Sequence, residues 1–255
     1  MAAAALSSCT NEDVVDVAQN RTIRFDTFVN NNTRAVTEVT TENLSSYYLF
    51  GKYGDATENY SELVFDNEPS SAIAYWTVNK YYAFGAYANG NDNRIDNATF
   101  DANTGKLKFP GYTPNDEKDL VAATARAEAG ADVTNKEAVS LQFVHMLSQV
   151  KFTFKTKVAD SYTIKISDLK FSAVKTADGS YTKTDETTGT IEWTKNATNS
   201  NGEYAYNEMS DIADKNKNYT DSDVKLVIPQ DNTDLISVTF TATLSGPGID
   251  SNVKK

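Results

Sequence analysis

Short runs in which apolar and polar residues alternate are the feature that most constrains how this chain can fold. From Ile236 to Leu244 every second residue is apolar, and the residues between are serine or threonine. From Thr22 to Thr27 apolar residues alternate with charged ones. This period of two is typical of a strand with one buried face. Many such runs, separated by turn residues, favour an all-β fold built from Greek-key sandwiches.

The length suits more than one sandwich. The chain has 255 residues, of which 40% are apolar, enough for a large hydrophobic core. About a dozen strands are expected, which favours two sandwiches with a boundary near residue 160. The stretch from Asp119 to Ala129 stays open, because its Ala and Glu residues favour a helix whereas its neighbours favour a strand.

Apolar residues change face twice. The apolar set moves to the opposite parity between Leu147 and Val150, and again between Ile166 and Leu169. A shift of one residue sends side chains to the other face of a strand, so each switch predicts a bulge or a corner.

Charge and cysteine content exclude several classes of protein. A single cysteine cannot pair within the chain, and Cys/His metal clusters are excluded with the disulfide scaffold. The net charge is -11, with no basic run longer than Lys254–Lys255, which argues against nucleic-acid binding. No apolar stretch approaches the roughly 20 residues of a membrane helix. We expect no cofactor and no metal.

No catalytic constellation stands out, and an enzyme is the weakest class considered. His145 lies on the apolar parity of an expected strand without a recognisable Ser, Asp or Cys partner, so we interpret it as a structural histidine. Asn89–Asn93 with Asp96 lacks the glycine and the bidentate glutamate of a calcium loop and reads as a solvated turn. Glycine-rich phosphate loops are absent.

The only cysteine has a lipoprotein-like context. Leu6–Cys9 is similar to a bacterial lipobox, in which the cysteine carries a diacylglycerol anchor and further acyl chains such as palmitate. Several acyl chains would anchor the protein stably. Residues 1–8 lack a full signal peptide. The alternatives for Cys9 are therefore lipidation, with residues 10–20 as a polar tether, and an unmodified cysteine in a leader.

Several stretches occur in an order that resembles one family. They are Ile23–Phe25, Thr33–Ala35, Trp76, Tyr82–Phe84, Asp119–Val121, Leu141–Ser148, Ile191–Trp193 and Leu226–Gln230. This order is similar to the fimbrillin, or type V pilin, family of gut and oral Bacteroidales. The resemblance covers most of residues 21–244.

The resemblance implies a domain plan. It predicts two tandem transthyretin-like Greek-key β-sandwich domains, at residues 35–160 and 161–255. They follow a lipoprotein leader and tether at 1–20 and an N-terminal pro-strand at 21–34. The chain stops soon after Gly246–Gly248, which leaves open whether the second sandwich has all its strands.

The resemblance also implies a route of assembly. An Arg-specific protease would cut between Arg34 and Ala35, with Arg21 and Arg24 as rival sites, and the vacated groove would accept a strand from a neighbouring subunit. The exchanged strand would present Ile23, Phe25, Thr27 and Val29 on one face. Burying three apolar side chains contributes roughly 5 to 9 kcal/mol, and each ladder hydrogen bond adds about 1 kcal/mol.

The expected function follows from these points. The chain is interpreted as a structural subunit or accessory lipoprotein of a type V pilus, or fimbrium, at the outer membrane and cell surface, which supports adhesion to host glycans or proteins. Its partners would be other fimbrial subunits, an Arg-specific protease and the membrane. The alternative is a monomeric, lipid-anchored glycan-binding module that keeps its leading strand. Stalk, tip and anchor roles are not separated by the sequence.

Overall fold

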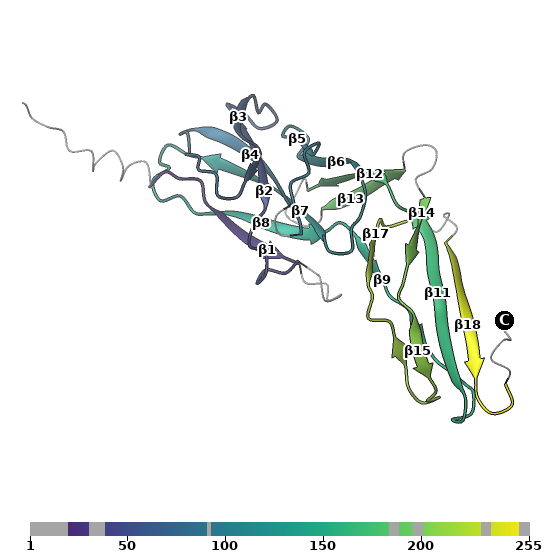
Figure 1. The fold of residues 1–255 in the computed structure, drawn as a ribbon. Coiled ribbons are helices and arrows are strands. Elements are labelled where there is room, and N and C mark those ends of the chain that lie inside the picture. The colour runs from purple at the N-terminus through teal and green to yellow at the C-terminus, as the bar shows by residue number, and fades with distance from the viewer. Residues whose placement is uncertain are drawn as a thin grey trace, which may run out of the picture.

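The fold is all-β, as expected. The computed structural model describes residues 20–30, 39–90, 93–183, 189–195, 201–230 and 236–249, and within these ranges every regular element is a strand. Figure 1 shows a broad body at the N-terminal side and a narrow arm that ends in long strands.

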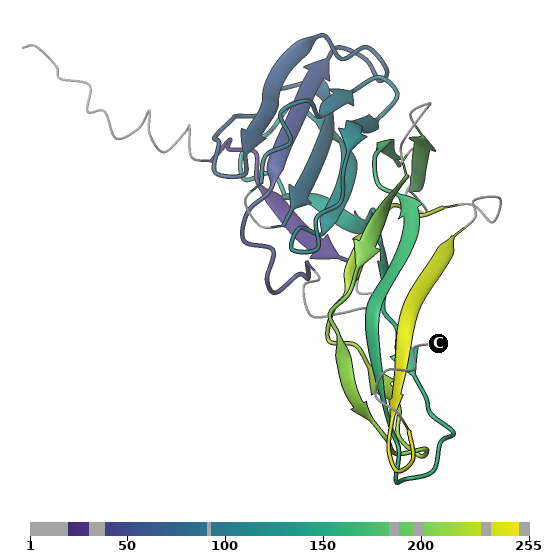
Figure 2. The ribbon, with the colours of Figure 1, turned by 45° about the vertical axis from the view of Figure 1, so that its right-hand side comes forward.

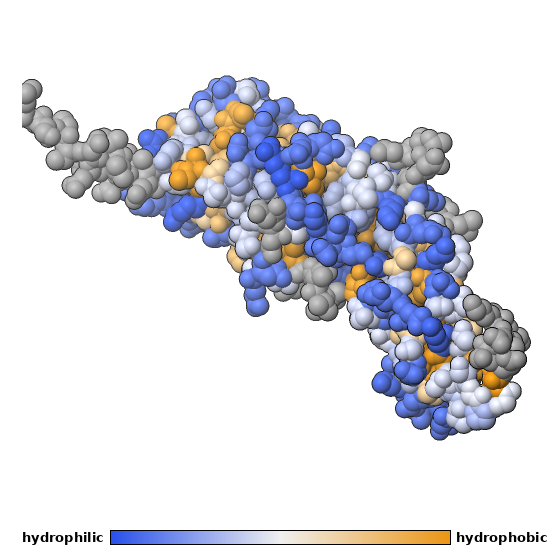
Figure 3. Space-filling model, in the orientation of Figure 1, coloured by the Kyte–Doolittle hydropathy of each residue, from blue (hydrophilic) through white to orange (hydrophobic). Residues whose placement is uncertain are grey.

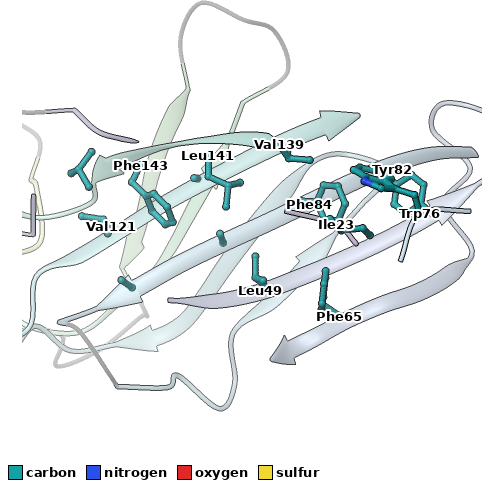
Figure 4. Packing of buried hydrophobic residues seen from close by; sticks show 14 of the residues in the cluster. Ile23, Leu49, Phe65, Trp76, Tyr82, Phe84, Val121, Val139, Leu141 and Phe143 are labelled. Carbon is teal, nitrogen blue, oxygen red and sulfur yellow. The ribbon is translucent and has the colours of Figure 1, made fainter. Parts of the chain in front are cut away.

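A continuous ladder of six strands runs through the body. In spatial order these strands are β1 (Phe25–Val29), β8 (Val139–His145), β7 (Leu120–Ala129), β4 (Lys80–Asn89), β2 (Tyr48–Gly54) and β3 (Glu62–Pro69). β1 and β8 are parallel, whereas the other pairs are antiparallel. β8 joins β7 only through Val144 and His145. The rest of β8, with β1, lies across one face of the β7-β4-β2-β3 strands, where their side chains share a core (Figure 4).

A second sheet covers the other face of these central strands. Its order is β13 (Thr190–Lys195), β12 (Ala177–Thr182), β6 (Lys106–Tyr112) and β5 (Thr99–Asp101). Tyr87 of β4, Leu120 of β7 and Phe109 of β6 are fully buried in the core between the two sheets. β4 is therefore covered on both faces, which explains why both parities of its sequence are apolar.

The stretch from Asp119 to Ala129, for which the sequence left helix and strand open, forms a strand. β7 occupies Leu120–Ala129, and its residues Leu120–Ala123 have no exposed surface. Burial on both faces in a central strand outweighs the helix propensity of its alanines, because propensity is worth less than about 1 kcal/mol per residue.

The arm is a thinner sandwich. Its long strand β11 (Thr163–Val174) pairs with β14 (Asn201–Ala205) and β15 (Met209–Ile212) at one edge and with β18 (Ser237–Ser245) at the other. Figure 2 shows these strands running side by side. The facing layer consists of two short pairs: β9 (Ser148–Val150) with β17 (Lys225–Val227), and β10 (Thr153–Phe154) with β16 (Tyr219–Thr220). Phe171, Tyr204 and Tyr206 are buried in the arm core.

Strand pairing crosses the domain boundary expected near residue 160. β12 and β13 follow that boundary in the chain, yet β12 pairs with β6 of the body. β11 therefore belongs to the arm, and the next two strands return to the body. The boundary at residue 160 stays a prediction, and any division of the chain has to account for this ladder.

Both parity switches correspond to irregular strands. The pairing of β11 with β18 shifts between Ser167 and Lys170, and Asp168 between them has a φ of 53°. This bulge confirms the switch expected between Ile166 and Leu169. The other break falls earlier than expected: β8 ends at His145 and β9 begins at Ser148, so the interruption is at Met146–Leu147.

Candidate functional site

The leading ribbon, residues 20–30, ends in a parallel strand at the edge of the body. β1 aligns Phe25 with Val139 and Val29 with Phe143. The carbonyl of Arg24 accepts a hydrogen bond from Val139 N–H at 2.8 Å, and Asn30 N–H donates to the carbonyl of Phe143 at 3.0 Å. Even-numbered residues thus bond to β8, and the N–H and C=O groups of Phe25, Thr27 and Val29 point away from it.

The side chains expected to share one face do so. Ile23 and Val29 are only 5% and 6% exposed, and Phe25 and Thr27 are half-buried. The Phe25 ring meets the Phe84 ring edge-on at 5.2 Å between centroids. Figure 4 shows Ile23 among the labelled residues of this core, which also includes Trp76. The ribbon therefore covers apolar residues of the body, which would be uncovered if it left.

The outer edge of the ribbon is bonded near both ends. At one end, Ile23 N–H donates to the carbonyl of Ala74 and Trp76 N–H donates to the carbonyl of Arg21, both at 2.9 Å. At the other end, the Thr41 hydroxyl accepts from Val29 N–H at 2.8 Å and lies 3.4 Å from the Val29 carbonyl, to which it donates. No pattern in the sequence distinguishes Thr41 from neighbouring threonines, so these contacts could not be expected.

The arginines considered as cut sites differ in position. Arg21 and Arg24 lie in the bonded ribbon, and the Arg24 guanidinium donates to the carbonyl of Lys136 at 2.9 Å. Arg34 and Ala35 lie outside the described residues, as does Cys9.

Tyr47 is a titratable group of the body that interacts electrostatically with the ribbon. The Tyr47 ring meets the Phe143 ring at 5.6 Å, and burial raises the pKa of its hydroxyl above the usual 10.0. The carboxylate of Asp26 in β1 raises this pKa further, because ionised Tyr47 would place a second negative charge near it.

β18 is a second edge strand, in the arm. Its side chains Val238 and Phe240 are 44% and 49% exposed, although Phe240 meets the Phe154 ring at 5.5 Å. Ala242 and Leu244 on the same parity are half-buried. Figure 3 shows that apolar surface forms small patches between polar residues on both body and arm. From Ile236 to Ser245 no residue is charged.

The two edge strands carry similar side-chain series. On its inward face the leading ribbon presents Ile23, Phe25, Thr27 and Val29, which are an aliphatic, an aromatic, a small β-branched and an aliphatic residue. β18 presents Val238, Phe240, Ala242 and Leu244, which gives an aliphatic, an aromatic, a small and an aliphatic residue in the same spacing.

His145 has an acidic partner that the sequence did not reveal. Its Nδ1 lies 2.7 Å from Asp119 Oδ2, and this buried carboxylate also accepts the N–H of Val39 at 3.1 Å. The sequence could not show this partner, because the two residues are 26 positions apart and meet only where β7 pairs with β8. The hydrogen bond fits the structural histidine expected from the sequence. The pair ties the chain after residue 38 to the body.

Other chemistry is sparse in the described part of the chain. No group of three or more His, Cys, Asp or Glu side chains is arranged to hold a metal ion there. Asn89 of the rejected calcium loop accepts a hydrogen bond from the Tyr112 hydroxyl at 3.0 Å. The same residues contain no helix long and apolar enough to span a bilayer.

Fold and site together define a β-sandwich protein whose edge strand completes an apolar core. The family model described as fimbrillin-like matches residues 21–254, and the chain belongs to this family. Membership makes it a protein of the fimbrial class and implies association with the cell-surface fimbrium and its other subunits.

Two solved structures are similar to this chain. A Bacteroides ovatus protein described as a candidate cell adhesion protein is 16% identical, with a TM-score of 0.41, over 89% of this chain and 84% of that one. The fimbrial anchor protein Mfa2 from Porphyromonas gingivalis is 11% identical, with a TM-score of 0.36, over 89% of this chain and 78% of that one. None of the curated proteins matches the chain.

Proposed function

We propose that this chain is a fimbrial subunit that assembles by exchanging its leading strand after proteolysis. The carrying observation is the edge position of β1, whose inward side chains complete the body core while its connection to Val39 runs through residues 31–38. A sandwich that loses such a strand presents apolar side chains and unpaired backbone groups, which favour addition of another strand.

The cut is proposed between Arg34 and Ala35. A protease binds an extended stretch of chain, and residues held in a sheet have to leave it first. The backbone carbonyls of Arg21 and Arg24 are both hydrogen-bonded within the ribbon, which disfavours them as rivals. Cleavage after Arg34 would separate the whole ribbon from the segment that begins at Val39.

The strand that replaces β1 is proposed to be β18 of a second copy. Its alternating series is similar to that of the leading ribbon. Its exposed Val238 and Phe240 would become buried in the groove that β1 leaves. Burying two such side chains contributes about 2 to 4 kcal/mol beyond their present state. Lipidation of Cys9 would attach the precursor to the outer membrane, and adhesion to host glycans or proteins would follow from surface display.

Digestion of the purified chain with an Arg-specific protease tests this proposal. We expect mass spectrometry to find a fragment that begins at Ala35, and SDS gels of unboiled samples to contain ladders of bound subunits. Arg34→Ala should abolish both, whereas the matched variant Arg21→Ala should leave both intact. Phe240→Asp should still be cut but should form no ladder.

The opposite outcome favours the alternative function. If the wild-type chain is cut but stays monomeric with its leading strand bound at a concentration where copies meet freely, strand exchange is refuted, and if it is not cut, the proteolytic trigger is refuted. A monomer that then binds immobilised glycans would support the glycan-binding module.

A further inference from the structure

We propose that Thr41 and the backbone of Ala74–Trp76 form a two-ended clamp that binds the main chain of whichever strand occupies the β1 position. The clamp retains the leading strand after the chain is cut, so that cleavage and release are separate steps. This consequence rests on the proposed strand exchange.

At one end of the clamp, a side chain makes the backbone hydrogen bonds that a neighbouring strand would otherwise make. The Thr41 hydroxyl bonds both backbone groups of Val29, the last residue of β1. A hydroxyl can accept and donate at once, which lets a single side chain satisfy the N–H and the C=O of one edge residue. Because Thr41 hydrogen-bonds only backbone groups, these bonds do not depend on which side chain the strand has at that position.

Thr41 is held in place by residues on both sides of it. Val39 is buried in the same core as Ile23 and Val29, and its N–H is bonded to the buried carboxylate of Asp119. Thr40 and Asn43 bond each other reciprocally, from Thr40 N–H to the Asn43 side chain and from Asn43 N–H to the Thr40 hydroxyl. The turn after Val39 therefore has a defined position that does not depend on β1 alone.

The other end of the clamp is backbone. Ala74 C=O and Trp76 N–H bond Ile23 and Arg21 on the outer edge of the ribbon. Trp76 is 2% exposed and its ring meets the Tyr82 ring at 4.6 Å, which fixes this segment to the body. The clamp thus has two anchored ends that lie on either side of Phe25 and Thr27.

Cutting the chain leaves these contacts in place. All residues of the clamp and all their partners in the ribbon lie outside residues 31–38, where the cut is proposed. The cut ribbon keeps its ladder to β8, its buried side chains and both clamp ends, so it should dissociate slowly unless a competitor displaces it. A displacing strand would take over the same backbone bonds in turn, beginning at Val29, next to the cut.

A chain with an inserted cleavage site tests retention. Residues 31–37 are replaced by the recognition sequence of a site-specific protease, and an affinity tag is placed at the N-terminus. After cleavage we expect the body to remain bound to the tagged leader on the affinity resin. Thr41→Val, which removes the hydroxyl at nearly constant shape, should speed loss of the body about two- to tenfold, whereas Thr41→Ser should match wild type.

N-methylated peptides test which backbone groups the clamp binds by hydrogen bonds. A synthetic peptide of residues 20–30 is added to the cut chain, and displacement of the tagged leader is measured. N-methylation at Val29 or at Ile23 removes a donor to the clamp and should weaken displacement. N-methylation at Thr27 is the matched control, because its N–H also points away from β8 and no partner for it is found among the described residues.

Two results would overturn the clamp. One is immediate release of the leader from the cut wild-type chain. The other is equal behaviour of Thr41→Val and Thr41→Ser together with equal behaviour of the three methylated peptides. Failure of the natural chain to be cut at Arg34 or to form ladders would instead count against the proposed function, since the inserted site bypasses both steps.

Discussion

β1 and β18 are both edge strands with the same alternating series of side chains, yet they differ in what covers them. β1 lies over four strands of the body; Val29 and the preceding Ile23 are almost fully buried, and Phe25 and Thr27 are half-buried. β18 faces a layer made of two short strand pairs, and its Phe240 meets one ring, that of Phe154. The difference shows that an alternating sequence predicts which side chains of a strand point inward but not how deeply they are buried.

The difference has a physical consequence for assembly. A strand that is already buried gains no burial by moving, whereas half-exposed apolar side chains gain burial in a deeper groove, and this gain has to outweigh the loss of the pairing between β18 and β11. Long, uncharged edge strands are also the ones that pair with other chains. β18 fits this description, and in the proposed exchange it would take the place of β1.

The largest expected contrast is in stability. Phe25→Ala should lower the free energy of unfolding by about 2 to 3 kcal/mol, because it removes half-buried ring contacts with Phe84 and Phe65. Phe240→Ala should cost about 1 kcal/mol or less, because half of that ring already contacts water. Urea unfolding of the uncut chain measures both. Equal losses would mean that the two strands are equally covered, which would remove the basis of the comparison.

A charge placed in each strand should give a smaller contrast. Thr27→Lys puts an ammonium on the inward, half-buried side of β1 and should cost about 1 to 2 kcal/mol. Thr239→Lys puts the same group on exposed β18 and should change stability by no more than about 0.5 kcal/mol. Thermal unfolding at matched pH compares them. A Thr239→Lys variant that unfolds as readily as Thr27→Lys would show that β18 is more covered than its exposure indicates.

The smallest expected effect is on pH dependence, and it involves β1 alone. The pKa of Tyr47 is raised in the folded chain, so the neutral hydroxyl favours folding. Its contribution is complete below pH 10 and is lost as the pH rises through the raised pKa. Retention of the cut leader should therefore weaken above pH 10.

Two variants isolate this effect from that of other tyrosines. Tyr47→Phe should show a shallower loss of leader retention with pH than wild type, and Asp26→Asn should lie between them. β18 contains no titratable side chain, so exposure of Phe240 should not follow this pH dependence. If Tyr47→Phe loses the leader with the same pH dependence as wild type, ionisation of Tyr47 does not cause that dependence.

The alternating runs determined much of this protein without the tertiary structure. They predicted an all-β chain, the inward face of β1 and the bulge in β11, because a pleated strand sends successive side chains to opposite faces whatever surrounds it. The ordered motifs identified the family. Cys9, Arg34 and Ala35 remain predictions from the sequence, since they lie outside the described residues.

Only the tertiary structure decided how those strands meet. It turned the alanine-rich stretch of β7 into a strand by burying both of its faces, and it ran β1 parallel to β8, more than a hundred residues away. It brought Asp119 to His145 and Thr41 to Val29. Such contacts depend on distances in space between segments far apart or irregular in sequence, and a local pattern of polarity carries no information about them.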